Sequence, residues 1–188
     1  MMKPSPAGDA RRTKGTSVIQ LVKMLRDLRH KRALRIPPAG AALLEERILP
    51  SEWYSYAAFA QLMQVAYEQL LGSSEENAMQ MGLVAANAAL AGPHGAFILK
   101  GDPAATVLAL RHLWRAANDY GALDATSEGS NAVVFTLTGF PDVMPVHAAM
   151  IASWAVAAAQ IAGSPRSRCE ILERPWTGAS RLRYRITF

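Results

Sequence analysis

Cysteine is almost absent from this chain of 188 residues, which contains only Cys169. A single cysteine excludes an internal disulfide and any zinc or iron–sulfur site that needs several cysteine ligands. A chain of this length buries roughly 70% of the surface that it exposes when unfolded, so it can fold without such cross-links. We therefore expect an ordinary hydrophobic core that requires neither a metal nor a cofactor.

Long hydrophobic segments are also absent. The N-terminus has no apolar run before its basic residues, which predicts that there is no signal peptide. Every apolar stretch is interrupted before the roughly 20 residues that a bilayer span requires. The longest, Met144 to Ala162, contains His147, Ser153 and Gln160, so we interpret it as a buried helix. These absences predict a cytoplasmic protein.

The sequence lacks the motifs of common enzymes. It contains no Gly-x-Ser-x-Gly, no Walker loop and no Gly-x-Gly-x-x-Gly. Its histidines, at positions 30, 94, 112 and 147, do not form a pair at metal-ligand spacing. Arg166 and Arg168 could activate Cys169 as a nucleophile, but a small apolar residue in a strand is the simpler interpretation. The sequence predicts neither a catalytic residue nor a metal site, and favours a binding protein over an enzyme.

Acidic residues are scarce in the first 35 positions, although the whole chain has a net charge of +5. Only Asp9 and Asp27 oppose the basic residues there, which are Lys3, Arg11, Arg12, Lys14, Lys23, Arg26, Arg29, Lys31, Arg32 and Arg35. Residues 1–15 have hardly an apolar side chain, so we expect a disordered basic tail followed by a single domain over residues 16–188.

An amphipathic helix is predicted to follow this tail, with Thr16 or Ser17 as its N-cap. We predict that it binds a partner through an apolar face and a basic face, which comprise Val18, Leu21 and Leu25, and Lys23, Arg26 and Arg29. The basic face could meet nucleic acid, an anionic membrane or an acidic protein. It could equally be a solvated surface, because the charge is not accompanied by any base-reading motif.

The rest of the chain predicts helices, a hairpin, a helix and a second hairpin. Helices are expected around 41–47, from Ser51 to Gly72, from 75 to Gly92 and from Asp102 to about Tyr120. Strands are expected at 123–126 and 132–138, then at 169–173 and 181–188, with a helix over 146–161 between them. This order favours an α+β fold in which a helical layer packs on a small antiparallel sheet.

Two groups of residues are candidates for binding. Trp53, Tyr54, Trp114 and His147 could line an apolar ligand pocket, although the aromatic residues could equally anchor helices in the core. The segment from Gly82 to Gly92 is rich in alanine and glycine, which would allow a neighbouring helix to approach closely. This segment predicts a homo-oligomer or a complex with a partner protein.

Three short motifs carry a resemblance to a known family. They are Ile48-Leu49-Pro50-Ser51-Glu52-Trp53-Tyr54, then Gly101-Asp102-Pro103 leading to Leu113-Trp114 and Tyr120-Gly121, and last the helix that ends at Ala162-Gly163. Together they resemble the myxobacterial DUF2378 family, which is similar to the superfamily of haem–NO-binding, 4-vinyl-reductase and TRAPP-subunit proteins. The resemblance implies a helical layer on a twisted sheet, often around an apolar pocket, in sensing or scaffold proteins. The haem branch carries a Tyr-x-Ser-x-Arg signature that is absent here, so neither haem nor metal is carried over.

These observations support three hypotheses. The first is a non-enzymatic regulatory or scaffold module that binds a protein partner and a small apolar ligand. The second is a basic arm that binds nucleic acid or an anionic membrane, and the third is an enzyme of unrecognised type.

Overall fold

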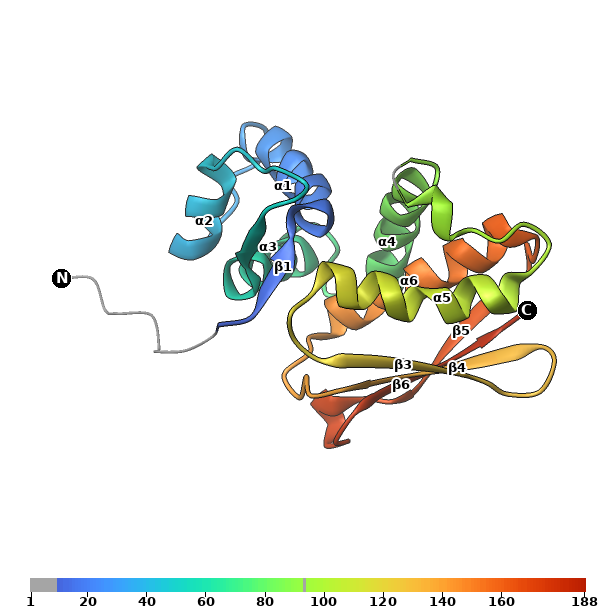
Figure 1. The fold of residues 1–188 in the computed structure, drawn as a ribbon. Coiled ribbons are helices and arrows are strands. Elements are labelled where there is room, and N and C mark those ends of the chain that lie inside the picture. The colour runs from blue at the N-terminus through green and yellow to red at the C-terminus, as the bar shows by residue number, and fades with distance from the viewer. Residues whose placement is uncertain (1–9, 93) are drawn as a thin grey trace. The chain divides into compact units, whose positions relative to one another are not determined.

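The chain has an α+β fold, seen in a computed structural model that describes residues 10–92 and 94–188 (Figure 1). It divides into two compact units. Unit 1 comprises the described residues up to Leu70 together with Ala117–Tyr120, and unit 2 comprises Leu71–Ala116 and Gly121–Phe188. This division differs from the single domain expected over residues 16–188. It arises because the helices before Leu70 pack on one another and form a core of their own.

Unit 1 contains three helices and a two-stranded sheet. Its elements are β1 (Arg12–Lys14), α1 (Gly15–Arg29), α2 (Pro38–Glu45), β2 (Trp53–Ser55) and α3 (Tyr56–Gln69). The two strands pair antiparallel, with Thr13 opposite Tyr54 and Lys14 opposite Trp53. Ser55 rather than Ser51 is the N-cap of α3, and its side chain accepts a hydrogen bond from the amide of Ala58.

The predicted tail over residues 1–15 is wrong for the part that the structure describes; residues 1–9 lie outside the described residues. Residues 12–14 form β1, and Gly15 begins α1. The amide of Gly15 donates to the carbonyl oxygen of Glu52 at 2.9 Å. A Cβ at position 15 would lie 2.0 Å from the carbonyl oxygen of Leu49, so only glycine fits. Composition alone failed because backbone pairing with a distant segment, not apolar burial, orders these residues.

Unit 2 contains a four-stranded antiparallel sheet and a layer of helices. Its elements are α4 (Glu75–Leu90), η1 (Gly95–Phe97), α5 (Pro103–Ala117), β3 (Ala122–Ser127), β4 (Ala132–Thr138), α6 (Pro145–Ala162), β5 (Arg168–Glu173), η2 (Pro175–Thr177) and β6 (Leu182–Thr187). The strand order is β3-β4-β6-β5, so the pairing of β4 with β6 joins the two hairpins. Both predicted hairpins, and the α+β class, are confirmed.

The inner face of the sheet packs against α6. Phe135, Tyr184 and Ile186 are almost completely buried on this face. The hydroxyl of Tyr184 donates to the carbonyl oxygen of Ala148 in α6 at 2.9 Å. In the described part of the chain, α6 alone has the length and composition of a membrane span, yet 72% of it is buried inside the protein. Its interpretation as a buried helix is confirmed.

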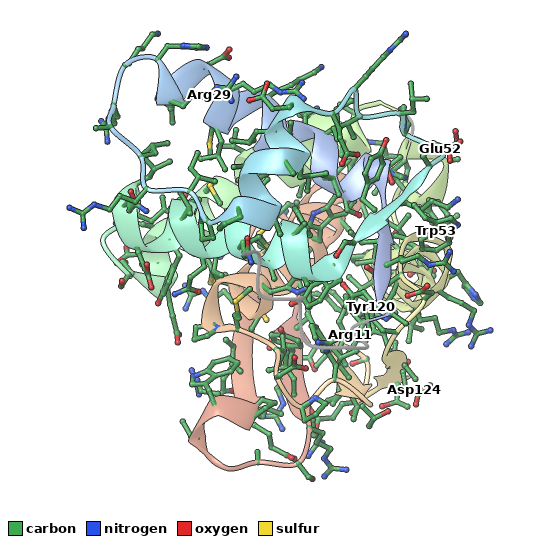
Figure 2. All side chains as sticks on the ribbon, turned by 90° about the vertical axis from the view of Figure 1, so that its left-hand side faces the viewer. Arg11, Arg29, Glu52, Trp53, Tyr120 and Asp124 are labelled. Atoms are coloured by element: carbon green, nitrogen blue, oxygen red, sulfur yellow. The ribbon has the colours of Figure 1, made fainter. Side chains whose placement is uncertain are left out.

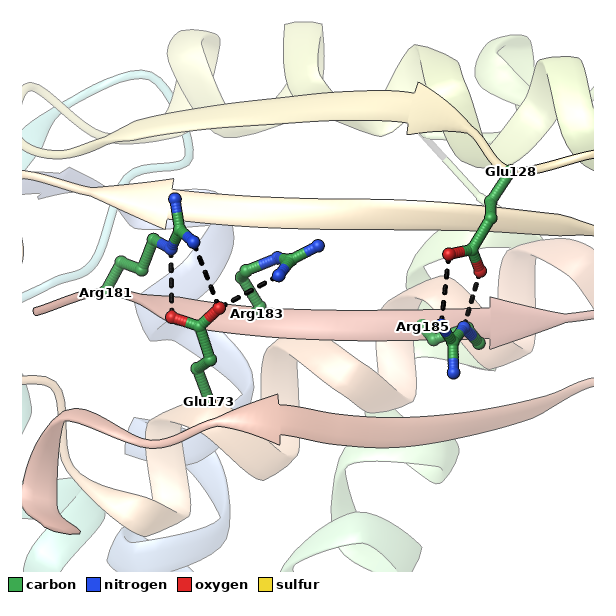
Figure 3. A network of polar contacts seen from close by, with 5 residues as sticks. All are labelled: Glu128, Glu173, Arg181, Arg183 and Arg185. Carbon is green, nitrogen blue, oxygen red and sulfur yellow. Dashed lines mark hydrogen bonds and ion pairs between the residues drawn. The ribbon is translucent and has the colours of Figure 1, made fainter. Parts of the chain in front are cut away.

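The outer face of the sheet is covered with paired charges (Figure 3). The Arg185 guanidinium donates two hydrogen bonds to Glu128, of 2.5 and 3.0 Å. Glu173 accepts from Arg181 at 2.9 and 3.1 Å, and from Arg183 at 2.9 Å. These two arginines lower the pKa of the Glu173 carboxyl to about 2. Arg181, Arg183 and Arg185 therefore each have a carboxylate partner on this face.

Two small residues allow α4 and α6 to pack closely. A Cβ added at Gly82 in α4 would lie 2.6 Å from the Ser153 hydroxyl oxygen and 2.8 Å from the Ser153 Cβ. The Ser153 hydroxyl shares its proton between two carbonyl oxygens, that of Met79 in α4 at 2.9 Å and that of Ala149 at 2.7 Å. The alanine- and glycine-rich face on which we based an oligomer is therefore used within the chain.

We expect Gly82→Ala to lower the free energy of unfolding by up to about 2 kcal/mol. Overpacking costs about 1–3 kcal/mol, and the better helix propensity of alanine offsets about 1 kcal/mol of it. Urea unfolding measures the effect. Asn87→Ala, at an exposed position of α4, is the control and should change stability by less than about 0.5 kcal/mol.

Adding Ser153→Gly to Gly82→Ala removes the clashing atoms, so the double variant should lose less stability than the sum of the two single variants. Additive losses would contradict the contact.

Candidate functional site

The position of Trp114 follows from how α5 begins and ends. The Asp102 carboxylate accepts a hydrogen bond from the amide of Ala105 at 2.8 Å, and Pro103 is the first residue of the helix, as the sequence predicted. Trp114 lies in the last turn, where its indole nitrogen donates to the carbonyl oxygen of Gly121 at 3.4 Å. The indole is therefore held between the end of α5 and the start of β3.

Trp114, Phe140 and His147 form an aromatic cluster inside unit 2. The ring centroids of Trp114 and His147 are 6.0 Å apart, and Phe140 lies 5.6 Å from His147 and 6.5 Å from Trp114. These distances are within the range of favourable aromatic contacts. Three separate elements contribute, namely α5, the β4–α6 connection and the first turn of α6. The structure thus brings together two residues that the sequence proposed for ligand binding.

His147 is electrically neutral in this cluster. Only 7% of the residue is exposed. Burial disfavours the charged imidazolium and lowers the pKa of the His147 side chain from its ordinary 6.5 to about 4. Near pH 7 the imidazole can therefore act as a hydrogen-bonding group of an apolar environment, but the charged imidazolium form that a general acid needs is scarce.

Trp53 and Tyr54 belong to unit 1 and have different environments. Tyr54 is buried, and its hydroxyl accepts a hydrogen bond from the amide of Leu49 at 2.7 Å. Trp53 is half-buried on the other face of β2, where the Lys14 ammonium lies 4.3 Å from its ring and the Arg12 guanidinium 5.5 Å. Tyr54 is thus a structural anchor. The four predicted ligand residues form two pairs, one in each unit.

Sequence reasoning missed a second aromatic and cationic contact in unit 1. The Arg11 guanidinium lies 5.0 Å from the ring of Tyr56 and 5.9 Å from that of Tyr120, and these two rings are 4.7 Å apart. Figure 2 shows Arg11, Tyr120 and Trp53 at one end of this unit. Tyr120 follows α5 far along the chain, so no local spacing links it to Arg11. Phe140 was missed for the same reason.

The predicted apolar partner surface of α1 is wrong. Val18 and Leu25 are fully buried, and Leu21 is only 6% exposed. Because α1 packs on α2 and α3, this face forms part of the core of unit 1. An apolar stripe on a helix looks the same in a sequence whether it contacts another element of the chain or a partner protein.

Two of the three predicted basic partner residues are also engaged inside unit 1. The Arg26 guanidinium donates to the carbonyl oxygens of Leu44, at 2.6 Å, and Glu46, at the end of α2. Arg29 forms an ion pair with Glu45. Arg26 thus satisfies carbonyl oxygens at the C-terminal end of α2, which carries a partial negative charge, while Arg29 pairs with the side chain of the last residue of α2. Lys23 remains exposed.

Cys169 is not an activated nucleophile, and the described residues provide no metal ligand set. Burial raises the pKa of the Cys169 thiol to about 12, so the reactive thiolate is scarce at neutral pH. Among the described residues, no three histidine, cysteine, aspartate or glutamate side chains are grouped closely enough to hold a metal ion.

Comparisons with known proteins identify the fold. No protein-family model matches the chain, and no curated protein does. Solved structures of H-NOX domains are similar to it. An H-NOX mutant of T. tengcongensis is 16% identical with a TM-score of 0.63, and the match covers 93% of this chain and 97% of that one. An oxygen-binding H-NOX domain related to soluble guanylate cyclases has 15% identity, a TM-score of 0.63 and coverages of 93% and 94%. A Cs H-NOX mutant is 16% identical with a TM-score of 0.65, and the match covers 93% of this chain and 96% of that one. The chain therefore has an H-NOX-like fold.

The buried His147 and the half-buried His94 do not fit a haem. A haem iron needs an axial side chain, commonly an imidazole, with space for the porphyrin beside it. In unit 2 the His147 ring contacts Trp114 and Phe140, and the half-buried His94 ring lies edge-on to Trp154 at 5.6 Å. His112 is exposed, as is His30, the histidine of unit 1. We derive no chemistry through haem.

The free energy of unfolding should decrease as the pH is lowered below about 6.5, and His147 should account for part of this decrease. An unfolded histidine takes up a proton at about pH 6.5, whereas folded His147 does so only near pH 4. Its contribution is therefore fully present above pH 6.5, and roughly 3 kcal/mol of it is lost as the pH falls to about 4. His147→Leu should flatten the dependence of the unfolding free energy on pH between 7 and 4. Urea titrations at several pH values measure it, with His112→Gln as an exposed control. A wild-type slope in His147→Leu would contradict the assignment.

Proposed function

We propose that this chain is a non-enzymatic regulatory module that binds a small apolar ligand without haem, and that also binds a protein partner. The observation that carries the proposal is the H-NOX-like fold, which matches over 93% of the chain and 94% of an H-NOX domain described as oxygen-binding. A fold that encloses a ligand in one protein can enclose a different ligand in another, because function depends on the residues of the site.

The aromatic cluster of Trp114, Phe140 and His147 supports the choice of an apolar ligand. Ligand sites in proteins are usually lined by apolar and aromatic groups, with a few polar atoms that orient the ligand. A neutral imidazole between two aromatic rings offers that combination, since His147 can exchange one hydrogen bond while the rings contact the rest of a flat molecule.

The narrower family and the compartment are parts of the same proposal. The motifs around Trp53, Asp102 and Gly163 support membership of the myxobacterial DUF2378 family within the H-NOX-like group. A cytoplasmic location would suit a module that regulates another protein.

We expect ligand binding to change the fluorescence of Trp114. A variant with Trp53→Phe, Trp154→Phe and Trp176→Phe keeps Trp114 as its one tryptophan, since the chain has four. Titration with anilinonaphthalene sulfonate, an aromatic probe, should quench or shift Trp114 emission with one-to-one saturation. Phe140→Leu should weaken this binding about tenfold, because it removes a ring that contacts His147. The matched control Phe188→Leu changes a phenylalanine at the end of the chain and should leave binding unchanged.

Titration with hemin tests the choice of ligand class. The protein should not develop the Soret band that one equivalent of bound haem would give. A stoichiometric band would overturn the non-haem part of the proposal, and failure of the aromatic probe to saturate Trp114 would overturn the apolar site.

A further inference from the structure

The structure separates the basic residues of the first 35 positions into those that have partners and those that do not. In β1, before α1, Arg12 pairs with Asp119 at 2.7 Å and Lys14 donates to the carbonyl oxygen of Ser51 at 2.6 Å. Within α1, Arg26 and Arg29 hold the end of α2. The exposed side chains of Lys31, Arg32 and Arg35 form no ion pair within the described part of the chain. We call these three residues the basic corner.

The basic corner lies in a stretch of uniform charge. Between Leu28 and Leu44 the sequence contains no aspartate or glutamate, whereas Arg29, Lys31, Arg32 and Arg35 all lie there. Exposed charges of one sign repel each other unless a partner neutralises them. Salt bridges pair Arg181, Arg183 and Arg185 on the outer face of the sheet, whereas no ion pair of the described residues involves the basic corner.

Backbone hydrogen bonds fix the shape of the corner. The amides of Lys31 and Arg32 donate to the carbonyl oxygen of Leu28 at 2.9 and 2.8 Å. The Gln69 side chain, at the end of α3, accepts from the amide of Arg35 at 2.9 Å and donates to the carbonyl oxygen of Arg35 at 2.9 Å. The backbone is therefore held at both ends while the cationic side chains extend into solvent. Preorganisation of this kind reduces the entropy that binding costs.

The chemistry of the corner selects among anionic partners. Between Leu28 and Glu52 there is no phenylalanine, tyrosine or tryptophan, and the exposed imidazole of His30 is the one ring on which a nucleic-acid base could stack. Leu34 and Ile36 are half-buried, and the exposed large apolar residues of the described chain, Leu49, Val84 and Leu99, lie outside the corner. It therefore lacks the apolar anchor that strengthens attachment to a membrane. The guanidinium groups of Arg32 and Arg35 and the ammonium group of Lys31 can bind carboxylates.

We propose that Lys31, Arg32 and Arg35 form a docking site for an acidic segment of a partner protein. This inference rests on the partner-binding part of the proposed function and gives the chemistry of that partner. The site lies in unit 1, at the end of α1 where Figure 2 labels Arg29, and it shares no residue with the aromatic cluster of unit 2.

The test uses the full chain and a fluorescent peptide of alternating glutamate and aspartate, with fluorescence anisotropy at low and moderate salt. Lys31→Gln with Arg32→Gln and Arg35→Gln should weaken binding at least tenfold, because three contacts between opposite charges are lost. The control variant Arg115→Gln with Arg166→Gln and Arg168→Gln removes the same charge from exposed positions of unit 2. It should weaken binding less than threefold, and both variants should unfold at nearly the wild-type temperature.

A second variant separates shape from charge. Gln69→Leu keeps every cation but removes both hydrogen bonds to the Arg35 backbone, so affinity should fall about threefold to fivefold. An equal loss of peptide affinity in the unit 2 control variant would show that the peptide responds to net charge alone, and would overturn the proposal. Tighter binding of single-stranded RNA or of phosphatidylserine vesicles than of the peptide would also overturn it. If the peptide fails while the probe still saturates Trp114, the docking site is rejected and the ligand site stands.

Discussion

Burial of α6 is the constraint on which unit 2 depends. An 18-residue helix with almost no charge must be covered on most sides, and the unit supplies a different neighbour for each side. The sheet covers one side through Tyr184, α4 covers another through the contact of Gly82 with Ser153, and Trp114 and Phe140 cover the first turn at His147. Through these contacts α6 holds the sheet, α4 and the end of α5 in place. The aromatic cluster is therefore a consequence of how this helix begins.

The same burial explains the chemistry of the cluster. An imidazole in the first turn of an exposed helix would keep its ordinary affinity for protons, whereas His147 is enclosed and stays neutral. Neutrality makes it compatible with an apolar ligand and unsuitable for acid–base catalysis near pH 7. The H-NOX-like fold by itself does not specify a ligand, because ligand choice depends on the residues of the site and not on the arrangement of helices and strands.

Unit 1 uses its basic residues in distinct ways along one helix. Before α1, cations contact tryptophan and tyrosine rings; within α1, arginines hold the end of α2; beyond α1, Lys31, Arg32 and Arg35 are exposed. A net charge of +5 therefore says little about anionic partners. What matters is which cations have no carbonyl or carboxylate partner inside the chain. Lys31, Arg32 and Arg35, in the loop after α1, are three exposed cations for which the described residues provide no ion pair.

The sequence by itself determined the elements with strong local signals. The N-cap at Asp102, the alternation of Ala132–Thr138 and the apolar run of α6 predicted α5, β4 and a buried helix, because backbone geometry and periodicity are local properties. Only the tertiary structure decided which residues meet. It ordered Arg12–Lys14 by pairing them with β2, buried Val18 and Leu25 in a core and brought Phe140 to Trp114 and His147. Contacts between residues distant in the chain depend on how the elements pack, which no local pattern encodes.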